Sequence, residues 1–168
     1  MPEVNKQNSI TLRHTLRPGD VGFITYLHGT LYAEEYGLTP EFEGYVASSL
    51  GKFAESHDEQ RDRLWIAEWQ GKIVGSIAIV GVSETVAQLR WFLIHPQTRG
   101  QGLGRRLIEE ALEFCRQHSY KSVFLLTLNN LYAAGHLYQA AGFVKTEATT
   151  HLIWGHQLTE ERYDLVFE

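Results

Sequence analysis

Hydrophobic residues in the N-terminal third of the chain recur at helical spacing in two stretches. The first set precedes a glycine at position 37 and contains Ile24, Leu27, Leu31 and Tyr32. A proline at position 40 suits the first turn of the second helix. The pattern predicts, in order, a strand over residues 9–17, a helix over residues 21–36 capped by Asp20, and a helix over residues 40–55.

The rest of the chain combines short apolar runs, typical of strands, with two more helical stretches. Gln70, Gly71 and Lys72 suit a hairpin connection. We expect strands over residues 64–69, 73–80, 86–95, 123–128, 143–151 and 162–167. An amphipathic stripe from Leu103 to Cys115 predicts a helix, and residues 131–141 predict another. This order indicates one α+β or mixed α/β domain over residues 9–168, after an N-terminal extension of residues 1–8.

Composition narrows the classes of function. The 168 residues carry a net charge of -5, which argues against nonspecific binding of nucleic acid. The single cysteine excludes an internal disulfide, and no signal peptide or membrane-length apolar run is evident, so we expect a cytoplasmic protein that does not enter membranes. The eight histidines include no pair at i,i+4, so no metal site is predicted.

The most specific motif lies between a predicted strand and a predicted helix. It comprises Arg99, Gly100, Gln101, Gly102, Leu103 and Gly104. Glycines let a ligand approach the backbone, and the first N–H groups of the helix have no partner within it, so the motif suits a phosphate or pyrophosphate.

The two arginines that follow this loop strengthen that interpretation. Arg105 and Arg106 would lie in a first helical turn, where the helix dipole disfavours each cation by about 0.3–1 kcal/mol. Glu109 and Glu110 could offset them in part, and a bound phosphate would do so better. The alternative is a tight turn with solvated arginines. The loop lacks the Gly-Lys-Ser/Thr ending of a P-loop, and its spacing differs from the dinucleotide-binding fingerprint.

These residues resemble the GNAT acetyltransferase superfamily. Its signature for acetyl-coenzyme A is Gln or Arg, two residues, Gly, one residue, then Gly or Ala, which Arg99, Gly102 and Gly104 match. The run 89–96 is similar to the family's fourth strand, and residues 134–138 with Gly142 and Phe143 are similar to its second cofactor motif. The chain resembles in particular GNAT domains fused behind winged-helix (MarR-type) regulators, although it contains no such DNA-binding part.

The resemblance implies a mostly antiparallel mixed sheet of about seven strands flanked by four helices, with acetyl-coenzyme A as cofactor. It implies that Phe92, Leu93 and Ile94 pair with the acetyl and pantetheine part, and that residues 99–104 with Arg105 hold the pyrophosphate. The family often has Asn three residues before the position of Ala134, where this chain has Leu131. Asn129 or Asn130 would then take its place.

Acetyl transfer to an amine needs a proton for the departing thiolate, an oxyanion donor and a neutral nucleophile. The resemblance assigns the acid role to Tyr138, for which a core tyrosine is the alternative, and the backbone N–H of Phe92 is the candidate oxyanion donor. Glu35, beside Glu34, is the candidate base, and a solvated helix end is its alternative. Glu68, Glu84 and water are further candidates.

We therefore expect direct acetyl transfer to a primary amine of a small molecule or protein. Cys115 lies on the core face of its helix, which argues against a covalent route. The alternative is a non-catalytic acyl-CoA-binding sensor or interaction module. A C-terminal strand at an exposed edge would allow a homodimer.

Overall fold

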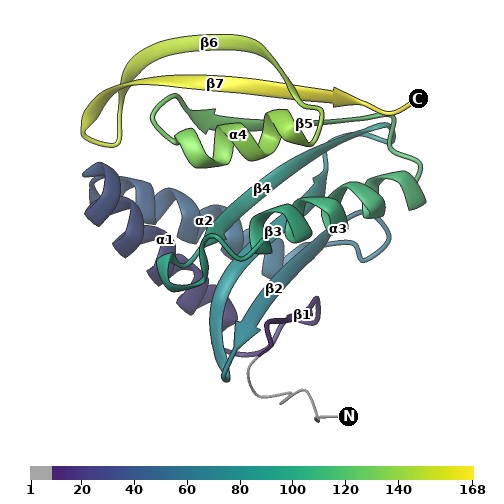
Figure 1. The fold of residues 1–168 in the computed structure, drawn as a ribbon, viewed down its shortest axis with the longest axis horizontal. Coiled ribbons are helices and arrows are strands. Elements are labelled where there is room, and N and C mark those ends of the chain that lie inside the picture. The colour runs from purple at the N-terminus through teal and green to yellow at the C-terminus, as the bar shows by residue number, and fades with distance from the viewer. Residues whose placement is uncertain (1–8) are drawn as a thin grey trace.

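Seven strands form one sheet in the order β1-β2-β3-β4-β5-β7-β6 in the computed structural model, which describes residues 9–168 (Figure 1). All neighbours are antiparallel except β4 and β5. The strands are β1 (Thr11–Arg13), β2 (Arg63–Trp69), β3 (Lys72–Gly81), β4 (Val86–Ile94), β5 (Ser122–Leu128), β6 (Val144–Ile153) and β7 (His156–Val166). The predicted mixed, mostly antiparallel sheet is confirmed.

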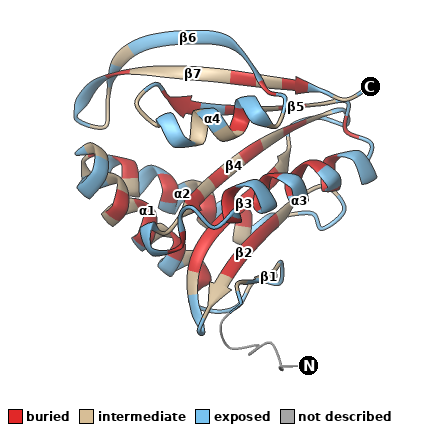
Figure 2. Cartoon of the chain, in the orientation of Figure 1, coloured by how far each residue is buried: buried red, intermediate tan, exposed pale blue. Residues whose placement is uncertain are grey.

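Two helices cover each face of the sheet, and each pair buries its own apolar cluster. On one face α1 (Asp20–Tyr36) and α2 (Pro40–Ser56) pack through Ile24, Val46 and Leu50. On the other face α3 (Leu103–Gln117) and α4 (Tyr132–Ala140) pack with strand residues such as Ile77 and Ile79. Figure 2 shows the buried residues concentrated in β2 to β5 and on the helix sides that face the sheet, whereas β6 is largely exposed.

The parallel pair β4 and β5 is joined at one end only. Val86, Ala87 and Gln88 pair with Ser122, Val123 and Phe124, and no later residues of the two strands pair. Beyond this point β4 continues along β3 to Ile94, and β5 continues along β7 to Leu128. The strands therefore diverge toward their C-terminal ends and leave an opening in the sheet.

A bulge lies in β4 beside this opening. The register between β3 and β4 shifts between Ser76 and Ala78, and Trp91 has a φ of 47°. The Ser76 hydroxyl donates to the Trp91 carbonyl oxygen over 2.6 Å, which holds the bulged backbone in place. Because a bulge leaves one residue outside the regular ladder, it can re-aim the backbone at Trp91 and Phe92.

The predicted elements are all present, with differences at their ends. The first strand shrinks from residues 9–17 to Thr11–Arg13, and the last one begins at His156 instead of residue 162. The expectation of an exposed C-terminal strand was wrong, because β7 lies between β5 and β6 and the edge strand is β6. A homodimer stays a prediction, and the predicted extension over residues 1–8 lies outside the described residues.

Asp20 is the first residue of α1 and not its cap, which is Gly19. Its side chain is 6% exposed and accepts two hydrogen bonds from the Arg13 guanidinium, at 2.7 and 2.8 Å. A third bond comes from the backbone N–H of Arg17 over 2.7 Å. Arg13 also donates to Glu68 in β2, so this ion pair connects β1, β2 and the start of α1.

We predict that Asp20→Ala lowers the free energy of unfolding by about 3 kcal/mol, because it leaves the Arg13 cation largely desolvated without its main partner. Urea unfolding followed by tryptophan fluorescence measures the change. Glu113→Ala is the matched control, since it removes an exposed partner of Arg116 at 3.7 Å and should leave the unfolding midpoint unchanged. Equal effects of the two substitutions would contradict the prediction.

Candidate active site

The loop before α3 has the open backbone that an anion site requires. Gly102 caps the helix with a φ of 78°, and no side chain accepts from the first helical N–H groups. A Cβ placed on Gly100 or Gly102 would meet no atom within 4 Å, so both glycines border open space. In the first hydrogen bond of the helix, the Arg106 N–H donates to the Gly102 carbonyl oxygen over 3.1 Å. The N–H groups of residues 103–105 thus have no partner within the helix and can bind an anion.

Gly104 has a different function in the same loop. Its Cβ would lie 2.8 Å from Leu137 in α4 and 3.3 Å from Phe92 in β4. The absence of a side chain therefore lets α3 approach α4 and β4 closely. This packing role explains the glycine without reference to a ligand.

A cavity of about 580 Å³ opens beside the loop, which is within the size range of small-molecule sites. Its walls come from α1, β4, the loop, α3 and α4. Of the residues predicted from the sequence, those that line it are Glu35, Phe92, Leu93, Ile94, Arg99, Gly100, Gly102, Leu103, Gly104, Arg105 and Ala134. We call this space the loop cavity.

Three predicted contacts do not line the loop cavity. Gln101 turns back, and its amide donates to the Gln97 carbonyl oxygen over 3.4 Å. The backbone N–H of Asn129 bonds to Thr159 in β7, and the buried Asn130 side-chain oxygen has no partner among the described residues. Leu131 lines the cavity instead, so the proposed replacement by Asn129 or Asn130 is not favoured by their placement.

Arg99 and Glu35 form an ion pair across the loop cavity. Arg99 Nη2 donates to Glu35 Oε1 over 2.7 Å, and Arg99 Nε donates to the Ile94 carbonyl oxygen over 3.1 Å. The pair ties the last turn of α1 to the loop. Glu35 therefore faces the predicted cofactor position with a cation beside it, a placement that does not favour the role of base. That role stays a prediction.

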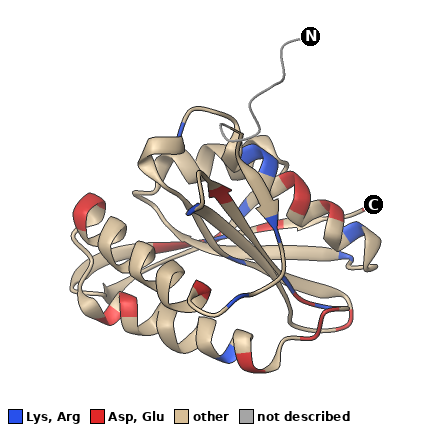
Figure 3. Cartoon of the chain, turned by 90° about the horizontal axis from the view of Figure 1, so that it is seen from below, with Lys and Arg blue, Asp and Glu red and all other residues tan. Residues whose placement is uncertain are grey.

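The other two arginines of the loop also have protein partners. Arg105 pairs with Glu109 at 2.9 Å, which confirms the expected i,i+4 contact, and Arg106 donates to the Ile10 carbonyl oxygen over 3.0 Å. Acidic and basic residues are interspersed on the face that Figure 3 shows. Both arginines of the first turn of α3 therefore contact other parts of the protein.

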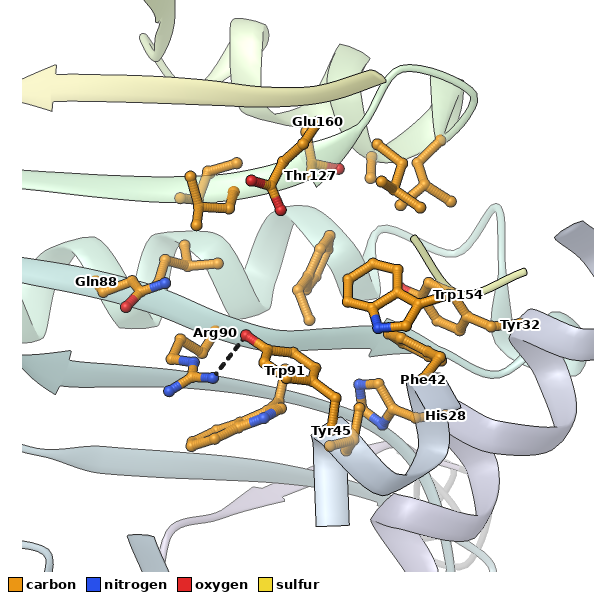
Figure 4. A pocket seen from close by; sticks show the side chains of 18 of the residues that line it. His28, Tyr32, Phe42, Tyr45, Gln88, Arg90, Trp91, Thr127, Trp154 and Glu160 are labelled. Carbon is orange, nitrogen blue, oxygen red and sulfur yellow. Dashed lines mark hydrogen bonds between the residues drawn. The ribbon is translucent and has the colours of Figure 1, made fainter. Parts of the chain in front are cut away.

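A second cavity, of about 120 Å³, lies where β4 and β5 diverge and is closed by α1, α2 and the turn between β6 and β7 (Figure 4). We call it the cleft cavity. It shares four lining residues with the loop cavity: Tyr32, Phe92, Leu131 and Ala134. The two spaces therefore meet beside the β4 bulge and the start of α4.

Tyr138 lines the cleft cavity and not the loop cavity. It is 5% exposed, and its ring lies 5.8 Å from that of Phe92 and 6.0 Å from those of Phe143 and Tyr163. Burial raises the pKa of the Tyr138 phenol well above its ordinary value, so the group keeps its proton at neutral pH. The residue is both a core tyrosine and a neighbour of the cavity junction.

Sequence reasoning missed His28, which also lines the cleft cavity. Its ring is buried, and Nδ1 lies 2.8 Å from the Ile24 carbonyl oxygen. A carbonyl only accepts, so Nδ1 carries the hydrogen and Nε2 is left as an acceptor. Burial lowers the pKa of His28 to about 4, which keeps the ring neutral. His28 lies four residues after Ile24 and therefore on the apolar face of the helix. This position is the one sign in the sequence that the ring is buried.

Cys115 is fully buried, as its position on the helix predicted. Burial raises the pKa of its thiol to about 12, so it is not a thiolate nucleophile. Within residues 9–168 no three His, Cys, Asp or Glu side chains gather into a group that could hold a metal ion, and the expectation of no metal stays a prediction. Across the same residues, no helix is both long and apolar enough to span a bilayer.

The fold places a cavity at the open start of α3 next to a second cavity with a partly aromatic wall. A model described as the Acetyltransferase (GNAT) family matches residues 24–143. The chain belongs to this family, as the motif at residues 99–104 indicated.

Curated relatives share part of the chain. N-acetyltransferase family 8 member 2 of Rattus norvegicus is 36% identical over 111 residues, which are 61% of this chain and 49% of that protein. The chain spans less than half the length of this relative, of N-acetyltransferase family 8 member 3 of Rattus norvegicus and of N-acetyltransferase 8B of Homo sapiens.

Solved structures extend the likeness over nearly the whole chain. An acetyltransferase of Salmonella typhimurium, solved with its cofactor acetyl-CoA, has a TM-score of 0.77 at 17% identity and covers 96% of this chain and 95% of its own. Spermidine N-acetyltransferase of Vibrio cholerae, in complex with CoA and spermine, has a TM-score of 0.70 at 24% identity, with 96% of each chain covered. At these identities the likeness shows the fold.

We predict that the free energy of unfolding depends on pH in the acid range, because His28 takes up a proton when the chain unfolds. Its pKa is about 4 in the folded chain against 6.5 ordinarily, so below 6.5 the unfolded chain binds a proton that the folded chain does not. The free energy of unfolding should fall as the pH decreases from 6.5 to 4, with a His28 contribution on the order of 3 kcal/mol.

Urea unfolding at intervals of pH measures this slope. His28→Gln should flatten it, whatever it does to stability at pH 7. His118→Gln is the matched control, because His118 makes the same Nδ1 contact with a carbonyl, that of Phe114 at 2.9 Å, but is only half-buried. Parallel pH profiles for the wild type and His28→Gln would refute the assignment.

Proposed function

We propose that this chain transfers an acetyl group from acetyl-coenzyme A to a primary amine of a small molecule or protein by direct attack. One observation carries the proposal: a cavity at an anion-binding helix start joins a second cavity that contains a buried phenol. Family membership supports the same activity. A cofactor held in the first space and an amine held in the second would meet at Phe92 and Ala134.

The chain offers suitable groups for each part of the cofactor. The N–H groups of residues 103–105 and the Arg99 and Arg105 guanidinium groups would hold the pyrophosphate. β4 beyond Gln88 has no strand on its β5 side, so its backbone from Phe92 to Ile94 can pair with the amides of the pantetheine arm. Acetyl-coenzyme A supplies the activated thioester, and the remaining chemistry belongs to the protein.

Proton balance assigns a role to Tyr138. The amine nitrogen bonds to the acetyl carbon as the carbon–sulfur bond breaks, and the bulged backbone at Phe92 would donate its N–H to the developing oxyanion. The sulfur takes a proton from Tyr138. Burial raises the pKa of this phenol, so it holds its proton at neutral pH but is a weak acid toward the thiolate. The amine loses one proton, which returns to Tyr138 through solvent.

The group that accepts the amine proton belongs to the cleft cavity in this proposal. Glu35 is paired with Arg99 on the loop side, and we assign it to positioning that guanidinium. Glu160 and the Nε2 atom of His28 line the cleft side, together with any water that enters with the substrate. Glu160 is the stronger candidate, because the low pKa of His28 makes it a weak base.

We predict that Tyr138→Phe lowers kcat by about 100-fold, the usual loss for one general acid, and changes the Kd for acetyl-coenzyme A by less than about twofold. A thiol-release assay with an amine panel measures turnover, and calorimetry measures binding.

Tyr120→Phe is the control, because Tyr120 is also buried and its hydroxyl donates to the Arg61 carbonyl oxygen over 2.7 Å, away from both cavities. Tyr120→Phe should leave kcat unchanged. Unchanged turnover in Tyr138→Phe would remove the acid role. Saturable binding without turnover of any amine would instead favour the non-catalytic sensor.

A further inference from the structure

Arg90 brings an uncompensated positive charge to the cleft cavity. It lies in β4, is half-buried, and its Nη2 donates to the Tyr45 hydroxyl over 3.1 Å. Its guanidinium carbon lies 4.6 Å from the centre of the Trp91 ring. Among the residues that the structure describes, no carboxylate lies within ion-pair distance of Arg90. Its partners are therefore neutral or aromatic, and none of its five N–H donors pairs with a carboxylate.

Glu160 brings the opposite charge to the same cavity from β7. It is half-buried, and within residues 9–168 no Lys or Arg lies within ion-pair distance of its carboxylate. Its neighbour Glu161 differs, since that side chain pairs with Lys145 at 3.5 Å and accepts from Tyr163 over 3.1 Å. Successive residues of a strand face opposite sides, which explains why only Glu160 reaches the cleft.

Figure 4 shows how these two side chains lie. Glu160 points into the cavity from one side, next to Thr127, and Arg90 lies on the other side with Tyr45. They are not paired with each other. Desolvating either charge alone would be costly when a ligand fills the space. A ligand that has a carboxylate together with an amine or ammonium group would compensate the charges of Arg90 and Glu160.

The rest of the wall is mainly apolar and aromatic. Phe42, Tyr45 and Trp154 pack together, with ring centres 5.0 Å apart for Phe42 and Trp154 and 5.5 Å apart for Tyr45 and Trp154. Such a wall suits an apolar or aromatic substituent. A polyamine fits less well, because its second cation would approach Arg90 and the cavity offers only one carboxylate.

Resting on the proposed function, we propose that the acetyl acceptor is a free α-amino acid with an apolar or aromatic side chain. Arg90 binds its carboxylate, Glu160 binds its amine, and the aromatic wall binds its side chain. The amine then lies in the cavity that meets the loop cavity at Phe92 and Ala134.

The test compares acceptors that differ in one group, with the full chain and saturating acetyl-coenzyme A. Phenylalanine, phenylalanine amide, phenethylamine and spermidine are assayed by thiol release, and leucine and tryptophan extend the side-chain series. We expect kcat/KM to be at least about tenfold higher for the best amino acid than for its amide or for phenethylamine, since a charge-assisted pair contributes about that factor.

Arg90→Gln should raise the KM for the amino acid by about tenfold, because the substrate carboxylate loses its partner. The KM for phenethylamine, which has no carboxylate, should change by less than about twofold. Glu160→Gln should lower kcat/KM for both. The controls are Arg116→Gln and Glu113→Gln, which change an exposed pair on α3 and should alter neither acceptor. Circular dichroism and acetyl-coenzyme A binding confirm that each variant is folded.

The outcomes separate this inference from the proposed function. Turnover that is equal for phenylalanine and phenethylamine, or highest for spermidine, overturns the amino-acid acceptor and leaves acetyl transfer standing. An equal loss for both acceptors in Arg90→Gln also overturns it. If no amino acid is acetylated but a lysine peptide is, the inference fails alone; if no amine of any class is acetylated while the cofactor binds, both fail.

Discussion

β4 and β5 are hydrogen-bonded only between residues 86–88 and 122–124, and the candidate site depends on this short pairing. A longer ladder would close the sheet and leave no room for the cleft cavity. Where the strands separate, the backbone of β4 faces open space on its β5 side, and buried backbone groups need partners. The bulge at Trp91, which the Ser76 hydroxyl holds in place, turns Phe92 toward the junction of the two cavities. The free backbone of β4 therefore borders that junction.

Helix packing divides this opening into two cavities that meet at Phe92 and Ala134. Gly104 allows α3 to approach Leu137 of α4, so the open N-terminus of α3 lies beside Ala134. On the opposite face α1 contributes Tyr32 to both cavities and Glu35 to the ion pair with Arg99. The loop cavity therefore presents unpaired N–H groups and the Arg99–Glu35 ion pair, while the cleft cavity presents a phenol, an imidazole, a guanidinium and a carboxylate. The proposed reaction depends on this arrangement, because it requires an anionic donor and an amine to be held at the same time.

The sequence predicts the parts of this arrangement that are local in the chain. The glycine spacing of residues 99–104 lies between a predicted strand and a predicted helix, so the loop could be located without coordinates. The start of β7 could not, because residues 156–161 are mostly polar. They are held as a strand by pairing with β6, joined from Glu160 onward by pairing with β5. The turn before it uses Trp154 and Gly155 with φ of 50° and 85°, a pair without a standard turn signature.

The residues that line the cleft cavity are also hard to predict, because distant segments of the chain bring them together. His28, Arg90 and Glu160 come from α1, β4 and β7, and nothing in their own segments distinguishes them from core or solvated positions. Each is polar next to apolar neighbours, which is costly unless another element supplies a partner. His28 finds its partner within α1, whereas Arg90 has only a neutral hydroxyl and Glu160 faces it unpaired. Unmatched charges in a partly buried space are a cost to folding, so their presence argues that a ligand completes them.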